Sequence, residues 1–323
     1  MVSKPRKLSR RNFLGAVALG ASLLFPSYLP AQEQRAPSFF SLKATGLPRE
    51  FKEKGFEIAG DWNMNYGREL FIIGENHLYP NILDLESKLI DYLVREYKAD
   101  SIGIEGFWGG PNEDLVSKVR NEYLNPLGKD LEREFGEGKI SDPLKRRYEK
   151  LEEYKKFIGK INIPCYGLEE KDLSIKVDLI NSINEIINYT IDKREKTEYE
   201  KIENIRLKEK FFIYLKTKLP EEKWLKDQTL KTISEDDYDA KKRRDECAAS
   251  FVDTLINQRN KAFARNIESY TKKLGSKKGI IITGNAHTEY FLAGFAKHDN
   301  LQHYLEFNSL IVRSPGINSN AKN

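Results

Sequence analysis

Short apolar runs alternate with longer amphipathic segments along most of the chain. The runs have the length and aliphatic composition of buried strands, and ELFIIG and GIIITG are the clearest of them. The segment NILDLESKLIDYLVREY (81–97) places apolar residues at helical spacing. Pro164 puts the third strand candidate at a sheet edge or a strand end, because proline cannot donate to the ladder. The strand candidates are residues 69–74, 100–105, 161–169, 279–284 and 303–313.

Strands separated by helices favour parallel pairing with right-handed crossovers. We therefore predict an α/β fold, in which a mixed, mainly parallel sheet is flanked by helices. Between the third and fourth strand candidates the chain is rich in Lys, Glu, Ile and Asn and has few turn signals. This composition predicts a large charged helical insertion at about residues 171–257. The helix that follows it is expected to end at Gly275, since glycine suits a helix C-cap.

The N-terminal segment has a basic start followed by an apolar run of 13 residues, Phe13–Phe25. This run is shorter than the roughly 20 residues that a spanning helix needs, and it fits the apolar region of a secretory signal. The paired arginines of SRRNFL are typical of the twin-arginine route, which exports folded proteins. We predict a signal peptide at residues 1–31, a linker at 32–50 and a single α/β domain at 51–323. The mature chain would be periplasmic or extracellular without a membrane span; an uncleaved anchor is the alternative.

Charge placement argues against nucleic-acid binding. The formal charge is +5, but residues 1–31 hold five of the 54 basic residues and no acidic one, which leaves 49 basic against 49 acidic residues. A neutral mature chain lacks the basic footprint that gives non-specific affinity for nucleic acid. The two cysteines, Cys165 and Cys247, are too few for a disulfide framework, and whether they pair is left open.

Two strand candidates end in the same motif, Gly-x-x-His, although the chain has only four histidines. Glycine lets the backbone turn sharply at a strand end, and the histidine three residues later can point back over the sheet edge. Because the carboxyl ends of parallel strands meet at one edge, we expect the polar residues at these ends to gather there. They are Glu75, His77, Glu105, Glu169 and His287.

Imidazole and carboxylate groups at one edge suit two kinds of chemistry. His77, Glu105 and His287 could hold a divalent metal ion and leave a position open for water. Alternatively, Glu75 or Glu105 could act directly as a general base. Arg259, on the helix before the last motif, could reach the carboxylates or an anionic substrate group. Spacing alone favours a surface arginine.

The succession IIGENH, SIGIEG, QRNKAFARNI and IIITGNAH resembles the Tiki/TraB superfamily. That superfamily includes the Tiki proteases, the TraB/GumN proteins, the erythromycin esterases and the ChaN-like haem-uptake proteins. The resemblance covers residues 68–106 and 257–295. It implies an α/β core in which His77 and His287 face each other, with Glu75 and Glu105 as acid/base or ligand carboxylates. It also implies that Arg259 belongs to the site.

We therefore predict an exported hydrolase that acts on a peptide or ester bond in a small-molecule or peptide substrate, with metal assistance. The alternative is a ChaN-like protein that binds haem or a metal ion for uptake without turnover. The segment NHLYPNILDL lacks the second histidine that the haem-uptake branch carries shortly after the first motif. A structural interaction protein built around the helical segment is a third alternative, supported only by composition.

Overall fold

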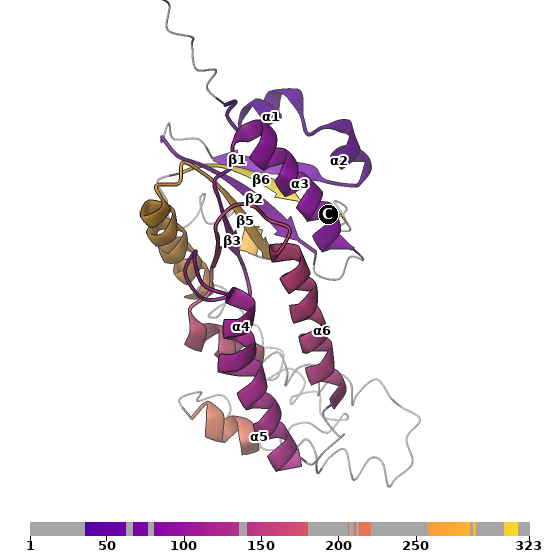
Figure 1. Cartoon of the computed structure of the whole chain (residues 1–323), viewed down its shortest axis with the longest axis vertical. Coiled ribbons are helices and arrows are strands. Elements are labelled where there is room, and N and C mark those ends of the chain that lie inside the picture. The colour runs from indigo at the N-terminus through magenta and orange to yellow at the C-terminus, as the bar shows by residue number, and fades with distance from the viewer. Residues whose placement is uncertain are drawn as a thin grey trace, which may run out of the picture. The chain divides into compact units, whose positions relative to one another are not determined.

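The computed structural model describes residues 36–62, 67–76, 81–135, 141–179, 206, 210, 213–220, 258–284, 287–288 and 307–315. Its centre is a six-stranded sheet with the order β1-β6-β2-β5-β3-β4 (Figure 1). β1 pairs antiparallel with β6, and every other neighbouring pair is parallel. The prediction of a mixed, mainly parallel sheet is therefore confirmed. The strands are β1 (Glu57–Trp62), β2 (Glu69–Glu75), β3 (Ser101–Ile104), β4 (Cys165–Gly167), β5 (Lys278–Gly284) and β6 (Asn308–Arg313).

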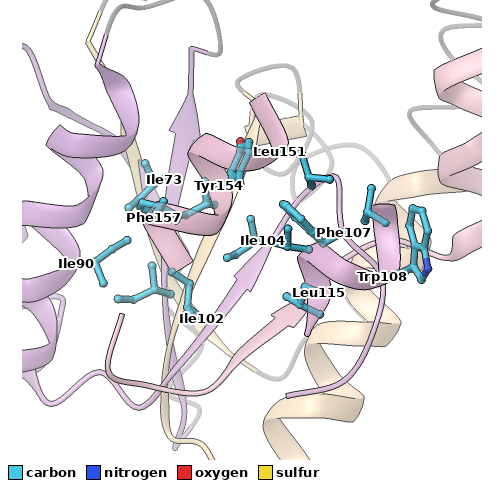
Figure 2. Packing of buried hydrophobic residues seen from close by; sticks show 14 of the residues in the cluster. Ile73, Ile90, Ile102, Ile104, Phe107, Trp108, Leu115, Leu151, Tyr154 and Phe157 are labelled. Atoms are coloured by element: carbon cyan, nitrogen blue, oxygen red, sulfur yellow. The ribbon is translucent and has the colours of Figure 1, made fainter. Parts of the chain in front are cut away.

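Side chains alternate between two faces of the sheet, and each face is covered by helices. Phe71 and Ile73 of β2 belong to an apolar cluster with residues of α3 (Ile82–Tyr97) and α6 (Ser141–Ile158), part of which Figure 2 shows. Leu70 and Ile72 belong to a second cluster with Phe263 and Ile267, which lie on the helix of residues 258–274. We call these the α3/α6 face and the 258–274 face. Strand parity therefore decides which helices each strand-end residue meets.

The apolar pattern located the parallel strands and two of the helices. All five strand candidates contain a strand, and the predicted helix at 81–97 is α3. The helix of residues 258–274 ends before Gly275, whose φ of +64° is the left-handed conformation of a C-cap, as predicted. Between β3 and α6 lie α4 (Leu115–Val119), a π-helix (Arg120–Leu124) and α5 (Asn125–Phe135).

The segment predicted to be a linker differs from that expectation over its described part. Residues 36–50 contain α1 (Ser41–Thr45) and the start of α2 (Arg49–Glu53). Phe39, Leu42 and Leu47 are buried in the cluster of the α3/α6 face. Isolated apolar residues of this kind have no periodicity to reveal them, so the sequence pattern missed their burial.

Other sequence predictions fall largely outside the described residues. The predicted signal peptide lies entirely outside the described residues. The structure describes only short helical pieces of the predicted charged insertion, such as residues 171–179 and 213–218. Within the described ranges, no helix is both long and apolar enough to cross a membrane.

Gly167 of β4 lies against the backbone of the loop that follows β3. A Cβ at this position would lie 2.3 Å from the carbonyl oxygen of Phe107 and 2.6 Å from Cα of Trp108. Backbone hydrogen bonds join the two segments: the N–H of Glu169 donates to the Phe107 oxygen at 2.9 Å, and that of Gly167 donates to Gly109. This close approach fixes the backbone that carries Glu169.

Gly167→Ala is expected to lower the free energy of unfolding by about 1–3 kcal/mol, because the backbone atoms it would meet must move. Chemical denaturation measures the change. Gly67→Ala is the matched control, since nothing lies within 4 Å of the Cβ position there. Equal stability of the two variants would contradict the close approach at Gly167.

Candidate functional site

Four polar side chains from separate segments meet at the carboxyl end of the parallel strands, on the 258–274 face. Glu105 follows β3, Glu169 follows β4, His287 follows β5, and Arg259 projects from the helix of residues 258–274. Glu169 and His287 are buried, and the side chains of Glu105 and Arg259 are only 11% and 14% exposed. We call these four residues the strand-end cluster. The structure thus brings together Glu105, Arg259 and His287, which the sequence had named as candidates.

Glu105 is held by both of its oxygens. Oε2 accepts hydrogen bonds from the hydroxyl of Thr283, at 2.6 Å, and from the backbone N–H of Gly284. Oε1 accepts from Nη2 of Arg259 at 2.7 Å and lies 3.4 Å from Nε2 of His287. One oxygen therefore anchors the carboxylate to β5, while the other faces the cationic and imidazole groups of the cluster.

Arg259 connects the members of the cluster. Its Nε donates to Oε2 of Glu169 at 3.2 Å, and its Nη2 donates to Oε1 of the same carboxylate. Its Nη1 lies 3.1 Å from Nε2 of His287. Burial acts to lower the pKa of Arg259, but Glu105 and Glu169 outweigh it and raise the pKa above its usual range. The guanidinium is therefore a permanent positive charge between two carboxylates.

Glu169 is the most buried carboxylate of the cluster. Burial raises its pKa, and Arg259 opposes that rise. Replacing a buried ion pair by apolar residues is often neutral or stabilising, because the charges lose their hydration. Stability alone is therefore a weak explanation for such a network at a strand end. Perturbed pKa values at converging polar groups are typical of functional sites.

Asn260 orients the imidazole of His287. Its Oδ1 lies 2.7 Å from Nδ1 of the ring, and Phe263 packs against the ring with centroids 4.9 Å apart. An amide oxygen accepts, so this contact assigns the ring proton to Nδ1 and leaves Nε2 to accept from Arg259. Sequence reasoning assigned no role to Asn260, although Asn260 directly follows Arg259 in the segment QRNKAFARNI.

Glu75 lies at the same edge of the sheet but on the α3/α6 face. Its carboxylate is buried and accepts a hydrogen bond from the hydroxyl of Tyr154, on α6, at 3.1 Å. The prediction that the strand-end residues all gather in one cluster is therefore wrong for Glu75. The alternation of side chains along each strand gives the reason. Glu75 shares the face of Ile73, two residues earlier, whereas Glu105 directly follows Ile104 and so points to the opposite face.

Glu86 of α3 is a second carboxyl group on the α3/α6 face, and no sequence motif marked it. The residue is fully buried, and neither side-chain oxygen has a hydrogen-bond partner among the described residues. Burial raises the pKa of Glu86 well above 4.5, and the charge of Glu75 raises it further. Burial raises the pKa of Tyr154, and the charges of Glu75, Glu86 and Glu105 raise it further. Figure 2 shows Tyr154 beside Phe107 and Phe157 in this cluster.

Glu86→Gln is expected to change how stability depends on pH. The folded-state pKa of this carboxyl is raised above its ordinary value of 4.5, so the carboxyl lowers the free energy of unfolding as the pH rises above 4.5. The loss of stability stops growing once the pH exceeds the folded-state pKa. The variant should therefore match the wild type near pH 4 and exceed its free energy of unfolding by about 1–3 kcal/mol near pH 8.

Urea denaturation over this pH range measures the Glu86 effect. Glu96→Gln, on the same helix and about half exposed, is the control and should follow the wild-type curve. Parallel curves for wild type and Glu86→Gln would show that Glu86 carries no raised pKa.

The predicted metal set can be examined only in part, because His77 lies outside the described residues. Among the residues that are described, no group of three or more His, Cys, Asp or Glu side chains could hold a metal ion. Nε2 of His287 and Oε1 of Glu105 both face the guanidinium of Arg259. A divalent cation at these two atoms would lie beside a permanent positive charge, so the described donors do not fit a metal ion in this arrangement.

The two cysteines offer no alternative nucleophile in the described structure. Burial raises the pKa of Cys165 to about 12, which keeps its thiol protonated and unreactive at neutral pH. Cys247, and with it the question of pairing, lies outside the described residues.

Comparison with protein-family models, curated proteins and solved structures gives no significant match for this chain. The resemblance to the Tiki/TraB superfamily therefore stays a prediction. The geometry of the strand-end cluster stands independently of it.

Proposed function

We propose that the protein is an exported hydrolase of the Tiki/TraB type, which cleaves a peptide or ester bond with water at the strand-end cluster. The observation that carries the proposal is the position of Oε1 of Glu105. This oxygen lies between Nη2 of Arg259, at 2.7 Å, and Nε2 of His287, at 3.4 Å, while Oε2 is anchored to β5. A carboxylate held in this way can take a proton without changing its orientation. The paired arginines near the N-terminus support export.

In the proposed reaction Glu105 acts as general base. It removes a proton from a water molecule as the water oxygen bonds to the carbonyl carbon of the substrate. The electron pair of the C=O bond moves to the carbonyl oxygen, and the guanidinium of Arg259 stabilises that charge. When the tetrahedral intermediate collapses, the C–O or C–N bond breaks and protonated Glu105 returns its proton to the leaving group. Water is the only co-reactant.

Glu169 and Asn260 act through their neighbours in this proposal. Glu169 accepts two hydrogen bonds from Arg259 and so fixes the plane of the guanidinium. Asn260 fixes the ring of His287. We assign the base to Glu105 rather than Glu75, because Glu75 is hydrogen-bonded to Tyr154 on the opposite face of the sheet. No step is routed through a metal ion, since the described donors face a guanidinium.

The proposal is tested with the mature chain after exhaustive dialysis against a chelator, with its metal content measured by mass spectrometry. A panel of 4-nitrophenyl esters and fluorogenic peptides is offered, and Glu105→Gln supplies the background. The proposal expects hydrolysis above that background by metal-free protein. Absence of hydrolysis on every substrate, with or without added metal, would contradict the hydrolase. Activity that appears only when zinc or manganese is added would overturn the metal-free mechanism.

A further inference from the structure

A cleft of about 570 Å³ adjoins the strand-end cluster. This volume is typical of sites that hold a small molecule, which range over about 300–1,000 Å³. Glu169 belongs to the cluster, and the next residue, Glu170, lines the cleft. In the same way Arg259 belongs to the cluster, and the preceding residue, Gln258, lines the cleft. A molecule held in the cleft would therefore lie next to the proposed catalytic groups.

The helix that carries Arg259 presents different sides to the cluster and to the cleft. Arg259 and Phe263 contact His287 of the cluster. Lys261 and Arg265 line the cleft, and they lie four residues apart, on the same side of the helix. The one helix thus places basic groups in the cleft while it positions the guanidinium at the site of cleavage.

Basic side chains outnumber acidic ones among the described residues that line the cleft. The basic residues are Lys176, Lys218, Lys261 and Arg265, and the acidic ones are Glu170 and Asp172. Arg265 pairs with Glu170 at the surface, so this pair is neutral and takes no part in binding here. Lys218 pairs with Asp130, which lies outside the lining, at 2.6 Å. Asp172 is in the first turn of the helix of residues 171–179, where the helix dipole offsets its charge.

Lys261 is the basic group of the lining that these contacts leave available. It is exposed and has no ion pair with any residue that the structure describes. Its like-charged neighbour Arg265, one turn further along the helix, repels it and weakens the helix. Lys261 therefore brings no evident gain in stability, whereas an anion in the cleft would offset this repulsion, and a cleft lined by basic groups attracts anions.

The rest of the cleft wall is apolar. Leu179 and Leu219 are buried, and Leu173 and Ile175 are half-buried beside them. A ligand that matches the whole lining has an apolar chain for the aliphatic side chains and an anionic group for Lys261.

Arg259 is not arranged to receive such an anion itself, contrary to one role that the sequence suggested for it. A guanidinium has five N–H groups, and the contacts to Glu169, Glu105 and His287 use four of them. Bidentate recognition of a carboxylate or phosphate needs two parallel donors. One N–H on Nη1 remains, which suits a single oxygen such as the carbonyl oxygen of the substrate.

We propose that the cleft binds an anionic group at the end of an apolar chain, and that this chain is the part of the substrate that leads away from the bond to be cleaved. Lys261 binds the anion, and the aliphatic side chains hold the chain. The inference rests on the proposed function and specifies its substrate class.

Calorimetry tests the cleft without turnover. The probes are octane-1-sulfonate, pentane-1-sulfonate and octyltrimethylammonium, offered to the mature chain at low salt. We expect octane-1-sulfonate to bind at least about tenfold more tightly than pentane-1-sulfonate, because three more methylenes are buried. It should also bind more tightly than octyltrimethylammonium, and the difference should shrink at high salt.

Lys261→Glu reverses the charge that carries the proposal. Because Lys261 is exposed, the variant should fold as the wild type does, which urea denaturation checks. Its affinity for octane-1-sulfonate should fall about tenfold, and its affinity for octyltrimethylammonium should rise. Lys272→Glu is the matched control, since Lys272 is exposed on the same helix but does not line the cleft, and its binding should equal that of the wild type.

A pair of esters carries the test to catalysis. The 4-nitrophenyl esters of octanoate and of suberate (as the monoester) are neutral and anionic at similar length. The ratio of kcat/KM for the anionic and neutral esters is compared within each protein, so a general change of activity cancels. We expect a ratio of about ten in the wild type and in Lys272→Glu, and a ratio below one in Lys261→Glu.

The outcomes separate this inference from the hydrolase itself. Sulfonate binding that weakens in Lys261→Glu, together with hydrolysis of neither ester, would sink the proposed function but keep the anion site. Equal binding of the two octyl ions, or sulfonate binding that Lys261→Glu does not change, would overturn the inference while leaving the hydrolase intact.

Discussion

Arg259→Met is expected to lower the free energy of unfolding by about 3–5 kcal/mol at neutral pH. The guanidinium joins Glu105 and Glu169, whose side chains are 11% and 0% exposed. Methionine keeps most of the side-chain length but leaves both carboxylates buried without a counter-charge. Urea denaturation at pH 7 measures the loss, with circular dichroism to show that the variant still folds.

The pH dependence of the Arg259→Met variant follows from the same charges. Burial already raises the folded-state pKa of Glu169, and without the opposing guanidinium this pKa rises further above its unfolded value. The destabilisation is therefore largest at neutral pH and shrinks as the pH falls towards the unfolded values, where the carboxyls are protonated in both states.

Arg265→Met is the matched control for Arg259→Met. It lies on the same helix and pairs with Glu170, but both side chains of that pair are about half exposed, at 54% and 49%. Its loss should stay below about 1 kcal/mol. An effect of Arg259→Met that equals the control, or that is the same at pH 5 and pH 8, would contradict the buried charge network.

Glu105→Gln is expected to lower kcat/KM by about 10²–10⁴-fold on any substrate that the wild type hydrolyses. Glutamine keeps an oxygen that can accept from Thr283 and Gly284, so the anchoring of the side chain to β5 survives. It cannot take a proton from water. The amide N–H₂ cannot accept from Nη2 of Arg259, so urea denaturation is measured beside the kinetics, and a loss of rate in a variant that is still folded separates a chemical role from a structural one.

Glu170→Gln is the control for Glu105→Gln, because Glu170 is exposed and lies next to a cluster residue. Its kcat/KM should remain within about twofold of wild type. Steady-state kinetics on the best substrate of the panel measures both variants. A loss below about tenfold for Glu105→Gln would remove Glu105 from the role of base.

The sequence was sufficient to predict the parallel strands and the edge at which polar residues gather. Runs such as IIG and IIITG are buried on both faces of the sheet, so they are apolar without interruption and easy to recognise. β1 escaped notice because EIAGDW is a short antiparallel edge strand in which a glycine and charged residues interrupt the apolar pattern. Strand-end glutamates and histidines then followed from the parallel arrangement alone.

The division of these residues between two faces needed tertiary information. The alternation of side chains along a strand places Glu75 and Glu105 on opposite faces of the sheet. This inference needs the end of each strand to be located to within one residue, which the sequence does not give. Which helix covers each face depends on how the chain crosses over. Tyr154 and Glu86 illustrate the limit: they lie on amphipathic helices without a motif, and only packing brings them to Glu75.

Chemical rescue of Glu105→Ala tests the central claim most directly, because it asks whether the missing group is a base. Hydrolysis of the best panel substrate is measured for wild type, Glu105→Ala and Glu170→Ala over a range of sodium formate concentrations, with sodium chloride holding the ionic strength constant. The account predicts that Glu105→Ala is nearly inactive alone and regains activity with formate in a saturable manner, while the other two proteins do not respond. Hydrolysis by Glu105→Ala at the wild-type rate without formate would contradict it.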